Sequence, residues 1–357
     1  MSELPAPRAP RSMPAVLALS LAVAIAGPAG AQTTPDMKRP LNLSLGSVSA
    51  SSSVYAFSVG LAGAVRKHDP AISVTAVEGG GGFDHARLMK QKVLDFSVSG
   101  SPATVDAIRK GQSGFQREGA WEPVRLMFMR NHNVTRIYVR ADVAQKSNIG
   151  TWSNLTRQPF GPGVPGTRDM QRILEANQLF STSVTMLPGS LDDAADQIRS
   201  GRIIGMAKGS PHDRFDAAMQ ALHYSTPLTV IGFAPDQVAR LTAKDPMNTF
   251  ISTPKGGIRD LPGIGPLDEL SSAVMVMSSS NMPQDVGYRI IKAVYAGWKE
   301  INEAYPPTAG LDPIRDAFGQ TPDVEGMVFH AGIVQYAKEQ GIAVPPRFIP
   351  PEYTGPK

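Results

Sequence analysis

The chain has 357 residues, 42% of them hydrophobic, and its 35 lysines and arginines against 31 aspartates and glutamates give a formal net charge of +4. This mildly basic charge comes without a block of lysines and arginines, so we expect no nucleic-acid partner. Because the chain has no cysteine, the sequence excludes disulfides, thiolate metal sites, a cysteine nucleophile and a lipid-modified N-terminal cysteine.

The first 31 residues have the pattern of a cleavable export signal. Arg8 and Arg11 precede an apolar stretch over 15–26 that is too short for an ordinary transmembrane helix, and a small-residue cleavage site follows at 29–31. We therefore expect cleavage after Ala31 and export to the periplasm, with an uncleaved anchor as the alternative. No later apolar run approaches about eighteen residues, so we expect no membrane insertion after cleavage.

From Leu41 onward, short apolar strands alternate with stretches of helical periodicity. This alternation is typical of an α/β fold in which mostly parallel sheets are flanked by helices. The first third predicts strands at 41–45, 72–77, 94–98, 124–129 and 137–139, with helices between the first three.

The middle third repeats this rhythm with elements of its own, which favours a second lobe. It predicts a helix over 170–177, a helix that begins after Ser190, and strands at 184–187, 203–207 and 228–233. A passage rich in proline and glycine, 254–266, is the candidate crossing between the lobes. A strand at 273–277 and a long helix from Pro283 to Ile301 follow it.

The predicted organisation is therefore a two-lobed globule with a ligand cleft between the lobes. The predicted parts are a signal peptide (1–31), the first part of lobe 1 (37–140), lobe 2 (141–262), a return segment of lobe 1 (263–344) and an irregular tail (345–357).

Four loops at predicted strand ends are unusually small and polar. They read "GSVSASSSVY" (46–55), "EGGGGFDHAR" (78–87), "SGSP" (99–102) and "GPGVPGTRD" (161–169). Ligands of open α/β sheets bind beyond the carboxyl ends of the strands, where backbone N–H groups at helix starts point outward. The predicted ligand-binding residues are Ser47, Ser51, Ser53, Tyr55, Gly82, Phe83, His85, Ser101, Gly166, Thr167, Arg168 and Lys208.

The fourth loop combines a hydroxyl with a cation at the start of a predicted helix. Thr167 is placed to cap this helix and Arg168 lies in its first turn. A helix N-terminus favours an anion, and an arginine can add a bidentate partner for a carboxylate. The alternative is an ordinary capped helix whose arginine is solvated.

The order of these loops resembles the TAXI solute receptors of TRAP transporters, a branch of the type 2 periplasmic binding proteins. The likeness extends over nearly all of the chain after the signal. Motifs similar to those of the family lie at 46–55, 81–85, 166–167, 195–203, 282–288 and 330–341. The loop before Gly166 differs from the family, because Pro165 has no N–H to offer an anion.

The resemblance implies a receptor without catalytic activity that closes two lobes over a small organic anion, such as a carboxylate or an amino acid. It further implies delivery of this ligand to the membrane subunits of an ion-driven TRAP permease. Neither a cofactor nor a metal is expected. A ligand-sensing receptor for a membrane histidine kinase is an alternative that the residues alone do not separate from a transport receptor.

An exported serine hydrolase is the second alternative. The chain has no Gly-x-Ser-x-Gly elbow, and its one Ser-x-x-Lys match, Ser252 to Lys255, contains Pro254. The six histidines form no His-x-x-x-His pair, which gives a metal site little support.

If Arg168 is a charge-assisted partner of the bound anion, Arg168→Ala should weaken binding by roughly 1.5 to 3 kcal/mol. Isothermal titration calorimetry with a carboxylate that the wild type binds measures this loss. An unchanged affinity would remove Arg168 from the site.

Overall fold

The computed structural model describes residues 40–152, 155, 158–160, 184–186, 190–245 and 247–355. These residues belong to one compact unit, Arg39–Lys357. The predicted signal peptide, the predicted helix at 170–177 and the loop at 161–169 lie outside the described residues. No helix in the described part of the chain is both long and apolar enough to cross a membrane.

The first lobe begins with the predicted alternation of strands and helices. Its elements are β1 (Leu41–Gly46), α1 (Ser53–His68), β2 (Ile72–Val77), α2 (Gly82–Lys90), β3 (Phe96–Gly100), α3 (Pro102–Lys110) and a 3-10 turn at Ser113–Phe115. β1 lies between β2 and β3 and pairs with both in parallel, with Leu41 opposite Ile72 and Leu45 opposite Phe96. The carboxyl ends of the three strands therefore lie at the same edge of the sheet.

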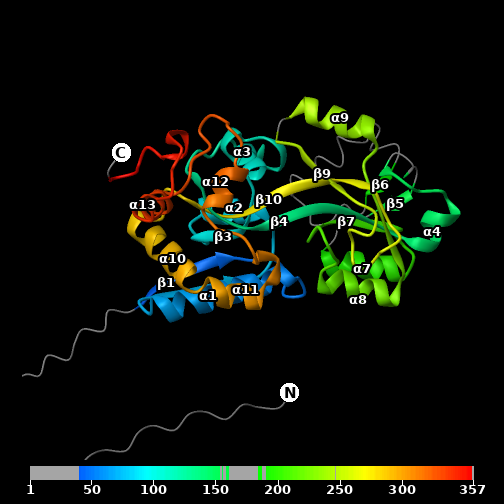
Figure 1. Cartoon of the computed structure of the whole chain (residues 1–357), viewed down its shortest axis with the longest axis horizontal. Coiled ribbons are helices and arrows are strands. Elements are labelled where there is room, and N and C mark those ends of the chain that lie inside the picture. The colour runs from blue at the N-terminus through cyan, green and yellow to red at the C-terminus, as the bar shows by residue number, and fades with distance from the viewer. Residues whose placement is uncertain are drawn as a thin grey trace, which may run out of the picture. The chain divides into compact units, whose positions relative to one another are not determined.

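Two long antiparallel strands, β4 (Val124–Arg140) and β10 (Leu267–Ser279), run side by side through both lobes (Figure 1). At one end they carry side chains of the first-lobe core, such as Met129 and Met275, and at the other end side chains of a second core, such as Ile137 and Leu270. The main sheet has the order β2-β1-β3-β10-β4-β7.

The separate strands predicted at 124–129 and 137–139 are thus one strand. The polar residues between them do not end it, because their backbone groups stay paired with β10 from Asn131 to Thr135. A run of polar side chains changes the exposure of a strand without removing its backbone hydrogen bonds.

The second lobe is built on the far ends of these two strands. Its elements are α4 (Ala141–Lys146), β5 (Gln158–Phe160), β6 (Val184–Met186), α7 (Leu191–Arg199), β7 (Gly205–Ser210), α8 (Ala217–Ser225), β8 (Leu228–Ile231), α9 (Pro235–Lys244) and β9 (Thr249–Thr253). β7 and β8 pair with β4 in the antiparallel sense, whereas β5 and β6 form a small parallel pair. The predicted α/β fold with helices flanking the sheet is confirmed. The main sheet is mixed and not mostly parallel as predicted, because β4 and β10 pair in the antiparallel sense with each other and with their other neighbouring strands.

The passage at 254–266 is the turn of a hairpin. It joins β9 to β10, and these strands pair directly, with Thr253 opposite Leu267. The crossing between the lobes therefore lies inside β4 and β10, which pair with each other on both sides of the cleft, and the interpretation of 254–266 as the crossing was wrong. Proline and glycine mark a turn, but they do not say what the turn connects.

The chain ends on the first lobe. Its last elements are α10 (Gln284–Ala296), α11 (Trp298–Ala304), a 3-10 turn at Pro306–Thr308, α12 (Arg315–Gln320), α13 (Ala331–Glu339) and a 3-10 turn at Pro346–Phe348. The single helix predicted from Pro283 to Ile301 is divided at Gly297, where a Cβ atom would lie 2.6 Å from the Cβ of Ala64 on α1. Glycine therefore permits this close contact between helices.

A buried ion pair connects the two long strands inside the second lobe. The fully buried guanidinium of Arg136 on β4 donates to both carboxylate oxygens of Glu269 on β10, at 2.7 and 3.1 Å. The same guanidinium donates to three carbonyl oxygens of the segment after β7, those of Pro211, His212 and Arg214. The pair therefore fixes this segment as well as the strands.

We expect Glu269→Ala to lower the free energy of unfolding by about 3 to 5 kcal/mol, because it leaves Arg136 buried without its counter-ion. Urea denaturation measures this change. The exposed Glu303 provides a matched control, since Glu303→Ala should shift stability by no more than about 0.5 kcal/mol. A loss below about 1 kcal/mol for Glu269→Ala would contradict the role of the pair.

Candidate ligand-binding cleft

A cleft lies between the two lobes. It is bounded by the carboxyl ends of β1, β2 and β3, by the middle of β4 and β10, and by residues of α7 and β7 in the second lobe. Its volume is about 980 Å³, including the solvent at its mouth. Its lining residues are Val48, Ser49, Ser52, Val54, Gly80, Gly81, Gly82, Phe83, Ser99, Gly100, Ser101, Thr104, Arg130, Asn133, Leu191, Lys208, Gly209, Ser272 and Val274. Residues of both lobes therefore face one cavity.

Three helices of the first lobe begin at this cleft. Ser52 caps α1 by accepting a hydrogen bond from the amide of Val54, and Ser101 caps α3 by accepting one from the amide of Thr104 at 3.1 Å. Gly81 precedes α2 without a side chain to cap it. Helix N-termini carry partial positive charge, so this wall of the cleft favours a negatively charged guest.

The run of four glycines has a steric reason. Gly79 and Gly80 have φ values of +108° and +81°, in the region where side chains other than glycine are strained. At Gly82, a Cβ atom would come within 2.6 Å of the carbonyl oxygen of Ser99. These glycines therefore allow the start of α2 to pack directly against the end of β3.

Arg130 is the strongest electrostatic feature of the cleft. Asn131 pairs with Val274 and Met129 pairs with Met275, so Arg130 is an extra residue on β4, a β-bulge. Bulges re-aim a side chain relative to the regular alternation of a strand. This bulge places Arg130 among the lining residues although only 2% of its surface is exposed.

The guanidinium of Arg130 lies against two aromatic rings. Its Cζ atom is 5.6 Å from the ring centre of Phe57 and 5.4 Å from that of Tyr305, and its Nη1 donates to the Tyr305 hydroxyl at 2.9 Å. Its buried Nε has no hydrogen-bond partner, and no described aspartate or glutamate forms an ion pair with it. Burial lowers the pKa of Arg130 because desolvation disfavours the charged form.

A buried cation without a counter-ion is costly, and a bound anion would relieve that cost. The sequence analysis missed Arg130 because it ended the strand at Met129 and searched only the loops. The available signal was a cation inside an otherwise apolar strand, "VRLMFMRNHNV" at 124–134, directly before two asparagines and a histidine.

Four of the predicted ligand-binding residues line the cleft: Gly82, Phe83, Ser101 and Lys208. Gly166, Thr167 and Arg168 lie outside the described residues. The remaining five predicted residues, from the first two loops, are not among the lining residues and are placed as follows.

The three predicted serines of the first loop do not line the cavity. Ser47 is fully buried and shares a hydrogen bond of 2.7 Å with Ser58 on α1, so it holds the loop against the helix. Ser51 is exposed and its hydroxyl lies 3.5 Å from the carboxylate of Asp192 at the start of α7. Ser53 is the first residue of α1 and is half-buried. Adjacent Ser52, which was not predicted, lines the cleft in its place.

Tyr55 lines a separate groove between α1 and β2, together with Val59 and Arg66. Tyr55 lies three residues after the cap residue Ser52, and its side chain lies in this groove and not in the cleft. The loop sequence did not reveal where the helix begins, and this position decides which side chains face the cleft.

His85 is completely buried behind the cleft wall. Its Nε2 lies 2.7 Å from the carbonyl oxygen of Gly79, which can only accept, so Nε2 carries the hydrogen. Its Nδ1 then accepts from the Ser97 hydroxyl at 2.6 Å. Burial lowers the pKa of His85, so its neutral form fixes the glycine turn to Ser97 on β3.

A model of the NMT1-like family matches residues 45–341. The chain belongs to the NMT1-like family. The match includes every described residue that lines the cleft. Among curated proteins, none matches the sequence.

Several solved structures resemble this NMT1-like chain at low identity. The periplasmic aliphatic sulphonate binding protein SsuA from Escherichia coli is 14% identical with a TM-score of 0.41, over 76% of each chain. A probable amino-acid ABC transporter extracellular-binding protein from Bacillus subtilis is 13% identical with a TM-score of 0.41, over 74% of this chain and 97% of its own.

The GluR0 ligand-binding core from Nostoc punctiforme, in complex with glutamate, is 11% identical with a TM-score of 0.43, over 74% of this chain and 99% of its own. At such identities and scores the likenesses are distant. The cleft is therefore interpreted from its own residues.

Other chemistry has little support in the described residues. Ser252 lies inside β9 opposite Asp268, so its Ser-x-x-Lys pattern does not open a helix. Among the described side chains, no group of three or more His, Asp or Glu is placed to hold a metal ion.

The buried histidines predict how stability depends on pH. The pKa of His85 lies below its usual value of 6.5 in the folded chain, so near that pH the unfolded chain binds a proton that the folded chain does not. Stability should therefore be full above pH about 6.5 and fall as the pH drops toward the folded pKa. His330, buried and bonded to the Met282 carbonyl, adds to this loss because its pKa is lowered too.

Urea denaturation between pH 7.5 and 5 measures the effect, using roughly half-unit steps. His85→Gln should flatten the pH dependence, and His85→Gln combined with His330→Gln should flatten it further. A wild-type slope in the double variant would show that neither histidine is held neutral by the fold.

Proposed function

We propose that the chain is an extracytoplasmic solute-binding receptor that captures a small organic anion between its two lobes. The observation that carries this proposal is Arg130, a buried residue of the cleft lining whose guanidinium has no acidic partner among the described residues. A carboxylate can accept two parallel hydrogen bonds from a guanidinium, which is a strong and directional contact. No bond is made or broken in this function.

The wall around Arg130 fits the rest of such a ligand. The hydroxyls of Ser49 and Ser52 and the starts of three helices provide donors, while Val54 and Val274 provide apolar contact. The combination of a few placed polar groups with apolar walls is typical of small-molecule sites.

Closure of the lobes would be driven by contacts that the ligand makes with both. The second lobe contributes Leu191, Lys208 and Gly209 to the cleft, and the sequence predicts that Gly166, Thr167 and Arg168 join them. A ligand that bridges both sides favours the closed state by its differential affinity for that state. Ser51 and Asp192 already approach each other from opposite lobes.

The destination of the ligand follows from the sequence resemblance. A signal peptide over 1–31 would send the receptor to the periplasm, and a TAXI-type receptor would deliver its ligand to the membrane subunits of a TRAP permease. Uptake of a labelled carboxylate by cells that carry the receptor and a candidate permease, with and without an ion gradient, tests this step.

Arg130→Met should weaken binding of a carboxylate by about 1.5 to 3 kcal/mol, roughly 10- to 150-fold, because it removes a charge-assisted hydrogen-bonding partner. A thermal-shift screen of the purified protein against monocarboxylates, dicarboxylates and amino acids selects the probe. Isothermal titration calorimetry with this probe then measures the loss.

Arg130→Met should weaken ligand binding without lowering the stability of the ligand-free protein. Methionine fills much of the arginine volume and removes an unpaired buried charge, so the melting temperature without ligand should not fall. Arg315→Met, a change of an exposed arginine on α12, serves as the matched control and should keep the wild-type affinity. Equal affinity in Arg130→Met and in the control would exclude Arg130 as the anchor.

A further inference from the structure

The cleft receives a long cationic side chain from each lobe, and the two differ in how their charge is paired. Arg130 of the first lobe has no acidic partner among the described residues. Lys208 of the second lobe lies against the carboxylate of Asp216, and both side chains are almost completely buried, at 9% and 2% exposure.

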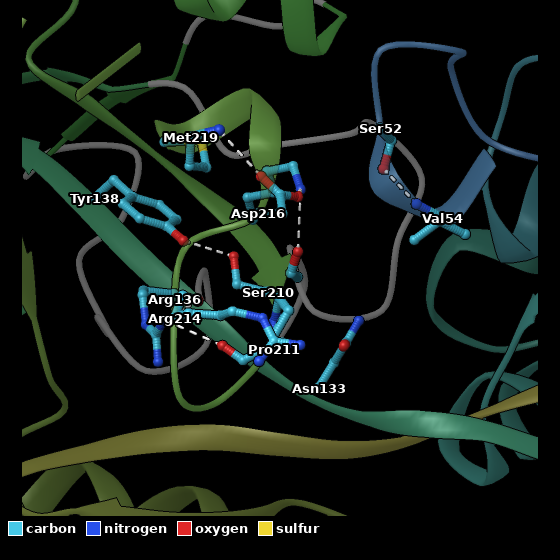
Figure 2. Close-up of polar contacts among 12 residues, drawn as sticks. Ser52, Val54, Asn133, Arg136, Tyr138, Ser210, Pro211, Arg214, Asp216 and Met219 are labelled. Atoms are coloured by element: carbon cyan, nitrogen blue, oxygen red, sulfur yellow. Dashed lines mark hydrogen bonds and ion pairs between the residues drawn. The ribbon is translucent and has the colours of Figure 1, made fainter. Parts of the chain in front are cut away.

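The two carboxylate oxygens of Asp216 make different contacts. Its Oδ1 accepts a hydrogen bond from the amide of Met219 at 3.0 Å and so caps α8 (Figure 2). Its Oδ2 contacts the Lys208 ammonium group. The ammonium group also donates to the carbonyl oxygen of Gly209 at 3.2 Å. The charge of Lys208 is therefore already compensated at the wall of the cleft.

The surroundings hold this pair in place. Tyr138 on β4 shares a hydrogen bond of 2.6 Å with Ser210, the last residue of β7, and Arg136 binds the carbonyl groups of the segment that leads to Asp216 (Figure 2). Because β7 and the start of α8 are both fixed to β4, Lys208 and Asp216 cannot separate without disturbing these contacts.

We propose that the cleft selects an organic acid with one negative charge, and that Asp216 sets this selectivity by neutralising Lys208. This inference rests on the proposed function, since it concerns the same cleft and the same class of ligand. The substrate class is a monocarboxylate whose acid group binds Arg130 and whose remaining part is uncharged.

A second acid group would meet an unfavourable environment at the opposite wall. To bind Lys208, it must either share the lysine with Asp216 or displace it, and two carboxylates at one site repel each other. Displacement would also leave a buried carboxylate without its counter-ion. The second carboxylate of a dianion therefore gains nothing from Lys208 while it loses its own hydration.

The test removes the negative charge of Asp216 and keeps its capping role. Asparagine and serine are both good N-cap residues, so Asp216→Asn and Asp216→Ser should preserve the start of α8. Arg136 pairs with Lys208 between β4 and β7, and Arg130 lies six residues earlier along β4, roughly 20 Å at the spacing of a strand. Because this backbone spacing does not set the separation of the two charged groups, the probes must cover several lengths.

Isothermal titration calorimetry would compare straight-chain monocarboxylates with α,ω-dicarboxylates of three to six carbons, on the purified protein. The wild type should prefer a monocarboxylate over the dicarboxylate of equal length. In both Asp216 variants the affinity for a dicarboxylate relative to that monocarboxylate should rise about tenfold, since Lys208 then offers a free charge-assisted contact.

Two further variants show whether the gain comes from Lys208. Asp216→Asn combined with Lys208→Gln should restore the wild-type preference. Asp213→Asn removes the same charge from a half-buried residue of the neighbouring segment, which pairs with Arg214, and should leave the preference unchanged.

Each outcome distinguishes this inference from the proposed function. Monocarboxylates that bind through Arg130, with no gain for dicarboxylates in either Asp216 variant, would overturn the selectivity and leave the receptor function standing. A wild type that prefers a dicarboxylate over the monocarboxylate of equal length would also overturn the selectivity and leave the receptor function standing. Failure of every acid to bind the wild type and both variants would contradict the proposed function itself.

Discussion

The antiparallel pairing of β4 with β10 is the constraint on which the rest of the molecule depends. These strands belong to both lobes, so the cleft is built across a ladder of backbone hydrogen bonds that the lobes share. The ladder is interrupted by a bulge at Arg130, at the level of the cleft. One extra residue in a strand thus brings a guanidinium to the cleft, between two aromatic rings.

The buried cations of the two lobes differ in whether a carboxylate within the fold pairs with them, and this difference determines which ligand charge the cleft favours. Arg136 and Lys208 each have a carboxylate partner within the fold, and both pairs are buried. Arg130 is buried to a similar degree, but among the described residues its guanidinium contacts the Tyr305 hydroxyl and the faces of two aromatic rings and no carboxylate. Because an unpaired buried cation is unfavourable, this arrangement favours a negatively charged guest at Arg130.

Local patterns predicted much of the fold and only part of the site. Alternating apolar residues identified β1, β2 and β3, and the helix start at Ser190 is present with a complete capping box to Asp193. The same reasoning divided β4 in two and joined α10 to α11, because exposure and close helix contact depend on distant partners. Among loop residues it selected Ser101 correctly as a lining residue, but it placed His85 in the cleft, whereas that ring lies behind the wall.

The sequence by itself determined the α/β alternation, the glycine and serine loops at the strand ends and the membership of the NMT1-like family, because these depend on residue type and local periodicity. Only the tertiary structure decided which polar side chains face the cleft and which charges are already paired. A bulge is visible only against its partner strand, and the partner of Lys208 is defined by the packing of α8 against β7. Electrostatic function depends on burial and on nearest neighbours in space, and neither is a property of a single stretch of sequence.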